Sequence, residues 1–128
     1  MKEEECIAYK GDKFQIEFYF DEKDKSPALE YVRKMSDKDK QKLIHLLKWM
    51  GDMSEIKNKT KFRNEGDGIF AFKPQPHRVL CFFFEGGKII LTNGFWKKQD
   101  KLPTGEKDKA LKIKEDYEAR INKGEYYG

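Results

Sequence analysis

The sequence predicts an α+β domain in which a pair of helices lies between a first strand and a three-stranded meander, and a last helix follows. Three observations predict this class. Residues 13–20 alternate between apolar and polar side chains, residues 37–50 repeat apolar side chains at helical spacing, and residues 69–95 contain three apolar runs separated by turn residues. We therefore expect a sheet rich in antiparallel pairs, with a helical hairpin after its first strand.

The length of 128 residues is that of one domain, and no internal repeat or change of composition divides it. The prediction is a single domain over residues 1–128. Residues 1–12 are polar and end in Gly-Asp, and residues 123–128 follow the expected last helix. Both ends are therefore expected to be flexible.

The first strand and the two following helices each have a local signal. Alternation places phenylalanine and isoleucine side chains on one face of the first strand, as in a half-buried strand. Ser26 can cap a helix and Pro27 fits its first position, so a short helix is expected over 27–34. The longer helix over 37–50 carries an apolar stripe, and Gly51 is its expected end.

A loop over 51–68, rich in lysine, asparagine and glycine, is expected to lead into strands over 69–73, 77–84 and 89–95. The middle strand is apolar almost throughout, which is typical of a central strand covered on both faces. Thr104 is expected to cap the last helix. Because the hairpin is expected to pack on one face of the sheet, the opposite face is expected to be free as a working surface.

Composition excludes several classes of protein. Aromatic residues make up 14% of the chain, which argues against disorder. No apolar run approaches the roughly 20 residues of a membrane helix, and the acidic start is not a secretory signal, so we expect a cytoplasmic protein without membrane contact. Cys6 and Cys81 form neither a disulfide framework nor a zinc motif, and Cys81 is expected to be buried. Phosphate loops, dinucleotide motifs and metal-ligand spacings are absent, so neither a metal nor a small-molecule cofactor is expected.

The positive charge is concentrated in the middle of the chain. The net charge is +4, but residues 57–101 hold ten lysine and arginine residues against four acidic ones. A focused basic surface favours a phosphate-bearing partner. The alternative is that a lysine-rich chain simply carries scattered, solvated cations, and charge alone favours that alternative.

The order of the predicted strands indicates that several of these cations lie close together. Lys73 ends one strand, Arg78 begins its neighbour, and Lys97 and Lys98 follow the strand that returns antiparallel to Arg78. These four side chains are therefore expected at one end of the sheet. Two more cations, on the loop entering the meander, can join them: Lys61 and Arg63.

Convergent cations suit phosphate chemistry. When the ribose 2′-hydroxyl attacks the adjacent phosphorus, negative charge builds on the phosphoryl oxygens, and fixed arginine and lysine side chains can stabilise it. Trp96 can stack on unpaired bases, although it can equally cover a sheet edge. Phe95 is expected in the core, and His45 is expected to be structural or exposed. His77, which opens the central strand beside Arg78, is a candidate RNA contact.

Five segments resemble, in order and spacing, those of one protein family. They are residues 18–22 (FYFDE), 26–32 (SPALEYV), 68–73 (GIFAFK), 78–84 (RVLCFFF) and 90–98 (ILTNGFWKK), of which the last is the sharpest. Together they resemble the RelE/HigB-like toxins of bacterial type II toxin–antitoxin systems, and most of all the phage-derived RelE/ParE-type branch. The resemblance covers about residues 13–122 and implies the small RelE-like fold.

The resemblance implies a ribosome-dependent mRNA endonuclease, or mRNA interferase, that needs no metal and is neutralised by a cognate antitoxin. Its partners would be the ribosome, mRNA and that antitoxin. By motif, Arg78 corresponds to the functional arginine, Lys73 to the basic residue closing the preceding strand, and Lys97 and Lys98 to the cationic pair. Lys61 and Arg63 match the basic loop only loosely, as RNA contacts.

Two points stay open from the sequence. Some relatives place a tyrosine or histidine acid–base group after the last strand, where this chain has KKQD, so Asp100, His77 or a lysine could serve as general base. A non-catalytic binding module of the RelE/ParE fold, or a phage protein that inhibits a host complex, is the alternative function. Such a module would depend on exposed aromatics such as Trp96 or Tyr126. A purely structural domain is a third reading.

Overall fold

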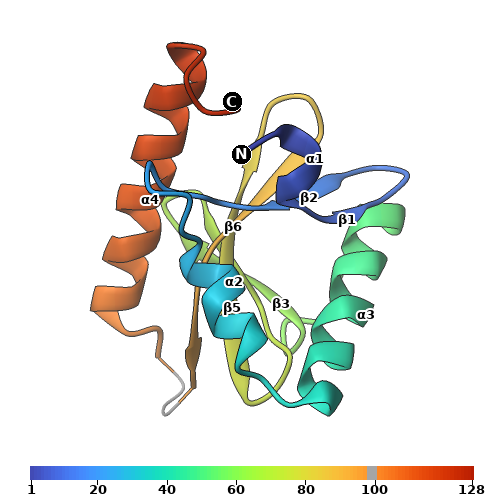
Figure 1. Cartoon of the computed structure of the whole chain (residues 1–128). Coiled ribbons are helices and arrows are strands. Elements are labelled where there is room, and N and C mark those ends of the chain that lie inside the picture. The colour runs from blue at the N-terminus through green and yellow to red at the C-terminus, as the bar shows by residue number, and fades with distance from the viewer. Residues whose placement is uncertain (98–100) are drawn as a thin grey trace.

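The computed structural model describes residues 1–97 and 101–128, and it consists of one six-stranded sheet with helices on both faces (Figure 1). The elements in chain order are α1 (Glu3–Cys6), β1 (Ile7–Lys10), β2 (Gln15–Phe18), α2 (Pro27–Arg33), α3 (Asp37–Met53), β3 (Phe62–Gly66), β4 (Ile69–Phe72), β5 (His77–Phe84), β6 (Lys88–Trp96) and α4 (Thr104–Asn122). Among the described residues, no helix has the length and apolar character needed to cross a membrane.

The strand order is β1-β2-β6-β5-β4-β3, and only the β2–β6 pair is parallel. The predicted α+β class is therefore confirmed, with an antiparallel-rich sheet, a helical hairpin and a C-terminal helix. The expected central strand is confirmed as well, because β5 and β6 lie in the middle of the sheet. β5 is buried along most of its length, including the free thiol of Cys81.

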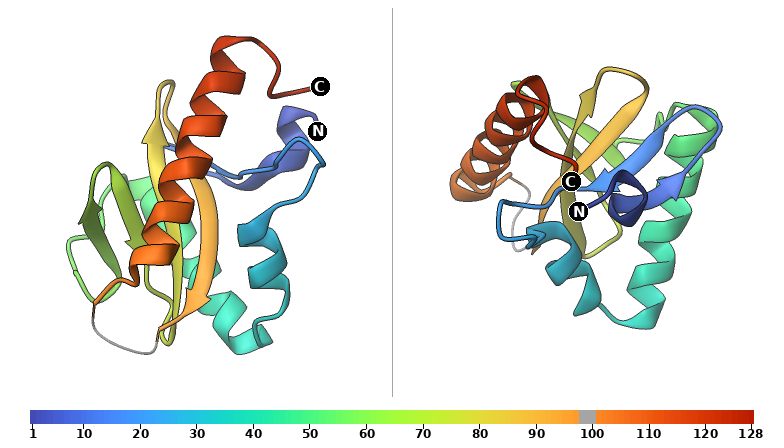
Figure 2. Two further views of the ribbon diagram at one scale, coloured as in Figure 1. Left: turned by 90° about the vertical axis from the view of Figure 1, so that its left-hand side faces the viewer. Right: turned by 45° about the horizontal axis from the view of Figure 1, so that its top comes forward.

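Both faces of the sheet are covered, which corrects the expectation of one free face. The first core lies between the sheet and α3 and contains Leu43, Leu47 and Phe72. The second core lies on the other face of the sheet, which α4 covers (Figure 2). In this core, Tyr117 packs against Phe82. In strands covered on both faces, the side chains that point to either face are buried. Neither face of the sheet centre is therefore left exposed as a working surface.

The expected helix starts are confirmed for the hairpin, and two other helix-end predictions are wrong. Ser26 and Ser36 each accept a backbone hydrogen bond at the start of α2 and α3. Thr104 is instead the first residue of α4, whose cap position is held by a proline. Gly51 does not end α3, since the helix runs on to Met53. Its missing side chain serves packing, because a Cβ there would lie 2.8 Å from the Tyr9 ring.

β3 lies within the region predicted as a loop. Its five residues are mostly exposed, and only Phe62 is buried. An edge strand of this kind has little apolar alternation to reveal it, and its place is set by pairing with β4, where Arg63 lies opposite Ala71. The strand matters for function because it brings Arg63 to the end of the meander.

The two chain ends, expected to be flexible, are packed against the domain. α1 and β1 occupy residues 3–10, with Cys6 fully buried. Tyr126 is buried in the second core, and its hydroxyl accepts a hydrogen bond from the Phe20 backbone N–H at 2.9 Å. The two termini lie side by side in both views of Figure 2, joined by a hydrogen bond from the Gly128 N–H to the Met1 carbonyl.

Candidate nucleic-acid interface

A shallow concavity at one end of the sheet gathers cations from four segments of the chain. Its charged lining residues are Arg63, Glu65, Lys73, Arg78, Lys97 and Lys101. Its apolar lining consists of Phe95 and the two residues before α4, Leu102 and Pro103. We call this surface the cationic concavity. Among its described lining residues, five cations face one carboxylate.

Strand pairing explains why these cations meet. Arg78 lies opposite Phe95 in the β5–β6 ladder, and the Lys97 N–H donates to the Pro76 carbonyl at 2.9 Å. On the other side, the Lys73 N–H donates to the Lys61 carbonyl at 2.8 Å. The predicted convergence of Lys73, Arg78 and Lys97 is therefore confirmed. Lys98 lies outside the described residues, as does Asp100, one of the candidate general bases.

Arg78 is the most buried cation of the concavity, with 5% of its surface exposed. Its Nη1 donates hydrogen bonds to the His77 carbonyl at 2.8 Å and to Gln75 Oε1 at 3.2 Å. Burial lowers the pKa of this guanidinium, and the charge of Glu65 opposes that shift. The contacts fix the guanidinium in place, as a preorganised anion-binding group requires.

Lys73 is half-buried beside Arg78, and its ammonium donates to the Lys59 carbonyl at 3.0 Å. Burial lowers its pKa, and the positive charges of Arg78 and Arg63 lower it further. A lysine in such surroundings holds its proton less firmly than an exposed one. It therefore combines a positive charge for phosphate with the capacity to give up a proton.

Glu65 is the residue that sequence reasoning missed. It is half-buried on β3, and it is the only carboxylate among the described residues that line the cationic concavity. Its charge acts on both Arg78 and Lys73. The signal for it would have been the edge strand β3, which places residues 63 and 65 on one face.

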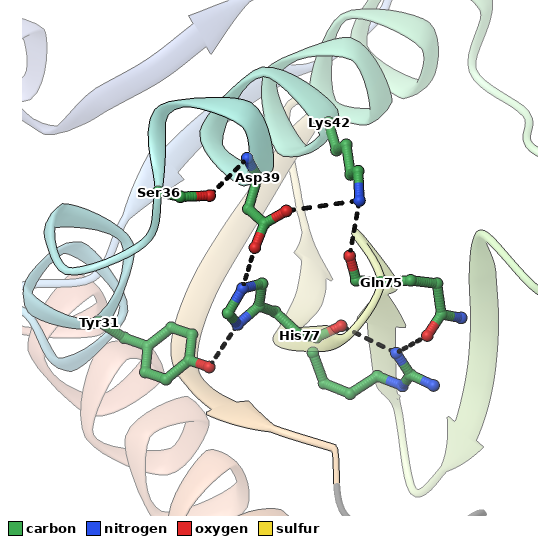
Figure 3. Close-up of polar contacts among 7 residues, drawn as sticks. Tyr31, Ser36, Asp39, Lys42, Gln75 and His77 are labelled. Carbon is green, nitrogen blue, oxygen red and sulfur yellow. Dashed lines mark hydrogen bonds and ion pairs between the residues drawn. The ribbon is translucent and has the colours of Figure 1, made fainter.

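His77 lies on the other face of the sheet from the cationic concavity and does not line it. Figure 3 shows the ring between two partners from the helical hairpin: Nδ1 lies 2.6 Å from the Tyr31 hydroxyl and Nε2 lies 2.8 Å from Asp39 Oδ2. With 5% of its surface exposed, His77 ties the hairpin to β5 rather than facing solvent. Adjacent strand residues point to opposite faces, which separates His77 from Arg78.

The bond from His77, together with the nearby Lys42 ammonium, lowers the pKa of the Asp39 carboxyl. Lys42 also donates to the Gln75 carbonyl at 3.1 Å (Figure 3). These contacts hold residues 74–77, which directly precede Arg78, against the start of α3. They therefore help to position Arg78 in the cationic concavity from the opposite face of the sheet.

The remaining predicted site residues divide into two groups. Arg63 lines the cationic concavity, and Phe95 is buried as expected while its side chain also reaches the concavity. Lys61 lines a neighbouring groove, and Trp96 is 55% exposed with its ring 5.2 Å from His77. In the part of the chain that the structure describes, no cluster of His, Cys, Asp and Glu side chains has the composition of a metal site.

Comparison with known proteins shows the family to which the chain belongs. A family model described as phage-derived protein Gp49-like matches residues 30–115, a span that contains α3 and the strands from β3 to β6. No curated protein matches the chain closely enough to count as a relative. Because the matched span is more than half of the sequence, the chain belongs to the phage-derived Gp49-like family, which is part of the RelE-like toxin superfamily.

Proposed function

We propose that this protein is the toxin of a type II toxin–antitoxin system and that it cleaves mRNA on the ribosome. The observation that carries the proposal is the cationic concavity, in which a fixed, buried arginine and several other cations surround one carboxylate. Scattered solvated lysines would not explain why a guanidinium is desolvated beside further positive charges. A phosphodiester that lies against this shallow surface supplies the missing negative charge.

The reaction that fits is transfer of the phosphoryl group within the RNA strand. The ribose 2′-hydroxyl loses its proton to a base and attacks the adjacent phosphorus, and the bond from phosphorus to the 5′-oxygen breaks. The products are a 2′,3′-cyclic phosphate and a 5′-hydroxyl end, so no water or cofactor is consumed. Glu65 is our candidate base, because it is the carboxylate placed among the phosphate-binding cations.

The cations take two roles in this scheme. Arg78 stabilises the charge that develops on the phosphoryl oxygens, which its planar guanidinium can bind at two points. Lys73, whose pKa is lowered, donates the proton that the leaving 5′-oxygen needs. Lys97 and Arg63 hold the strand, and the same role for Lys98 stays a prediction from the sequence. An antitoxin with acidic side chains would neutralise the toxin by covering the same surface.

The test is cleavage of a defined mRNA in a purified translation system, with and without ribosomes. We expect wild-type protein to cut only when ribosomes are present, and Arg78→Ala and Glu65→Gln to remove the cuts. Arg33→Ala is the matched control, because Arg33 is on α2 and does not line the cationic concavity. Cleavage that persists in a folded Arg78→Ala protein would contradict the proposed site.

A non-catalytic docking module is the second candidate. It is favoured by Trp96, a large apolar side chain left 55% exposed at the end of β6. Tyr126, the other aromatic considered for docking, is buried and therefore inaccessible to a partner. If wild-type protein binds a host protein complex but never cuts message, and if Trp96→Ala alone abolishes that binding, the docking function replaces the nuclease.

A further inference from the structure

A second hollow lies beside the cationic concavity, between α3 and residues 73–75. We call it the α3 groove. Its volume of about 490 Å³ falls within the ~300–1,000 Å³ typical of small-molecule pockets. Trp49 and His45, whose rings lie 6.0 Å apart, and Pro74 form part of its lining. Lys73 lines both hollows, so a strand bound in the cationic concavity has the α3 groove next to it.

The charges of the α3 groove suit a nucleotide. Four lysines line it and no acidic residue does among those the structure describes: Lys38, Lys42, Lys61 and Lys73. Lys42 is already held by Asp39 and the Gln75 carbonyl, and Lys73 by the Lys59 carbonyl, so Lys38 and Lys61 are the other two cations of the lining. An exposed tryptophan ring with a cationic border is a combination that binds a base together with its phosphates.

A third hollow, which shares Arg63, Glu65 and Lys101 with the cationic concavity, has the contrary character. It has a similar volume of about 450 Å³, but its lining carries as many acids as cations. Two of them, Asp67 and Lys107, already form an ion pair at 2.9 Å. A polyanion leaving the cationic concavity is therefore drawn toward the α3 groove rather than toward this balanced hollow.

Trp49 has no part in the folded core. It is 40% exposed and belongs to neither apolar cluster, although it stands on the same helix as the buried Leu46 and Met50. Two other large apolar side chains of α3 are exposed without lining the α3 groove: Ile44 and Met53. They give matched controls, because they share the helix and the exposure of Trp49 but not its position.

We propose that the α3 groove binds one nucleobase of the RNA, from a nucleotide that flanks the phosphate in the cationic concavity. The base stacks on Trp49, and Lys61 and Lys73 bind the connecting phosphates. The identity of the ligand as RNA rests on the proposed function. The proposal adds a base-binding subsite on α3 that adjoins the cleavage site and shares Lys73 with it.

The test uses a short 2′-O-methyl RNA, which binds but cannot be cleaved because its attacking hydroxyl is blocked. The chain has two tryptophans, so a Trp96→Phe protein reports on Trp49 alone. We expect the RNA to quench Trp49 fluorescence, and an oligonucleotide lacking the stacked base to bind without quenching. In the wild-type background, Trp49→Ala should weaken RNA binding roughly 5- to 150-fold, Trp49→Phe much less, and Ile44→Ala not at all.

The outcomes separate this proposal from the proposed function. RNA binding without quenching, and with the same affinity in folded Trp49→Ala protein, overturns the α3 groove assignment while ribosome-dependent cleavage still supports the nuclease. Quenching and Trp49-dependent binding in a protein that never cuts message support the base site and remove the nuclease. Failure to bind RNA even at low salt overturns the α3 groove assignment, and the ribosome-dependent cleavage assay then decides the proposed function separately. An acidic antitoxin peptide that quenches Trp49 when RNA does not would assign the groove to a protein.

Discussion

Two buried charged side chains, one near each end of the central strand β6, differ in whether the protein supplies them with an oppositely charged partner. Near the start of β6, the carboxylate of Glu17 is 1% exposed and is fully partnered, by Lys88 Nζ at 3.1 Å, by Gln15 Nε2 at 2.8 Å and by the Tyr127 hydroxyl. Near its end, Arg78 is almost as buried, yet no carboxylate among the described residues forms an ion pair with it.

The difference distinguishes a charge that serves the fold from one that serves a ligand. A buried ion pair is tolerated when partners satisfy it, and Glu17 meets that condition within the protein. Arg78 has hydrogen bonds but further cations as neighbours, an arrangement that costs stability and is found where a negatively charged ligand binds. We therefore interpret Glu17 as a structural residue and propose that Arg78 is a functional one.

The largest expected effect is on catalysis at the Arg78 end. Arg78→Ala should lower the rate of ribosome-dependent cleavage by about 10²–10³, because it removes a preorganised donor from the phosphate. The midpoint of urea unfolding should stay near that of wild type, since no carboxylate among the described residues would lose an ion pair. Single-turnover cleavage and urea titration on the same preparation measure the two effects. A loss of activity that simply follows unfolding would erase the distinction between the two ends.

At the other end the expected effect is on stability. Glu17→Ala leaves Gln15 and Tyr127 without their buried acceptor, while Lys88 keeps Glu3 as a partner, and we expect a loss of about 1–3 kcal/mol in the free energy of unfolding. Cleavage at a temperature where the variant remains folded should match wild type. Urea unfolding followed by circular dichroism measures the first quantity. An unchanged stability, or a cleavage defect in folded protein, would argue that the Glu17 cluster is not merely structural.

A smaller effect concerns pH at Lys73. Because burial and neighbouring cations lower its pKa, the ammonium should lose its proton below the ordinary lysine value of about 10.4. RNA affinity should therefore fall as pH rises from neutral toward that value. Lys73→Arg, which keeps its charge, should remove this alkaline decline. Fluorescence anisotropy with a labelled 2′-O-methyl RNA gives the profile, and identical profiles for the two proteins would contradict a pKa shift at Lys73.

The smallest predicted effect is a loss of folding stability at low pH that is due to Asp39, which contacts His77 on the opposite face of the sheet from the cationic concavity. Its folded pKa is lowered by the hydrogen bond from His77, so the carboxylate contributes stability above its unfolded pKa of about 3.9 and loses it as pH falls further. Asp39→Asn should be less stable than wild type at neutral pH and should show a weaker decline below pH ~4. Thermal midpoints across this range measure it, and parallel curves for both proteins would contradict the assignment.

The elements predicted correctly from sequence are those with a strong local pattern. The alternation around β2 and the helical stripe of α3 each reflect one apolar face, and the apolar run of β5 reflects two. β1 and β3 lack such a pattern, because both are edge strands fixed by pairing with a neighbour. Burial of Glu17 had no local signal either, since its partners come from distant parts of the chain.

For the site, the sequence predicted which cations lie close together, but it predicted neither the carboxylate beside them nor the face of the sheet on which His77 lies. An antiparallel meander fixes which strand ends are adjacent, so the order of the strands was enough to bring Lys73, Arg78 and Lys97 together. Glu65 was missed with its strand. His77 was expected to contact RNA together with Arg78, but the two side chains point to opposite faces of β5. Which face each residue takes depends on the helices that pack on the sheet, and the strand sequence alone does not show it.

The central claim is that the Arg78 end acts on RNA and the Glu17 end does not. The most direct measurement compares wild type, Arg78→Ala and Glu17→Ala in one ribosome-dependent cleavage assay, at a temperature where all three are folded by circular dichroism. The account predicts full cleavage by wild type and Glu17→Ala and about 10²–10³ slower cleavage by Arg78→Ala. Equal cleavage by all three, or the reverse order of the two variants, would contradict it.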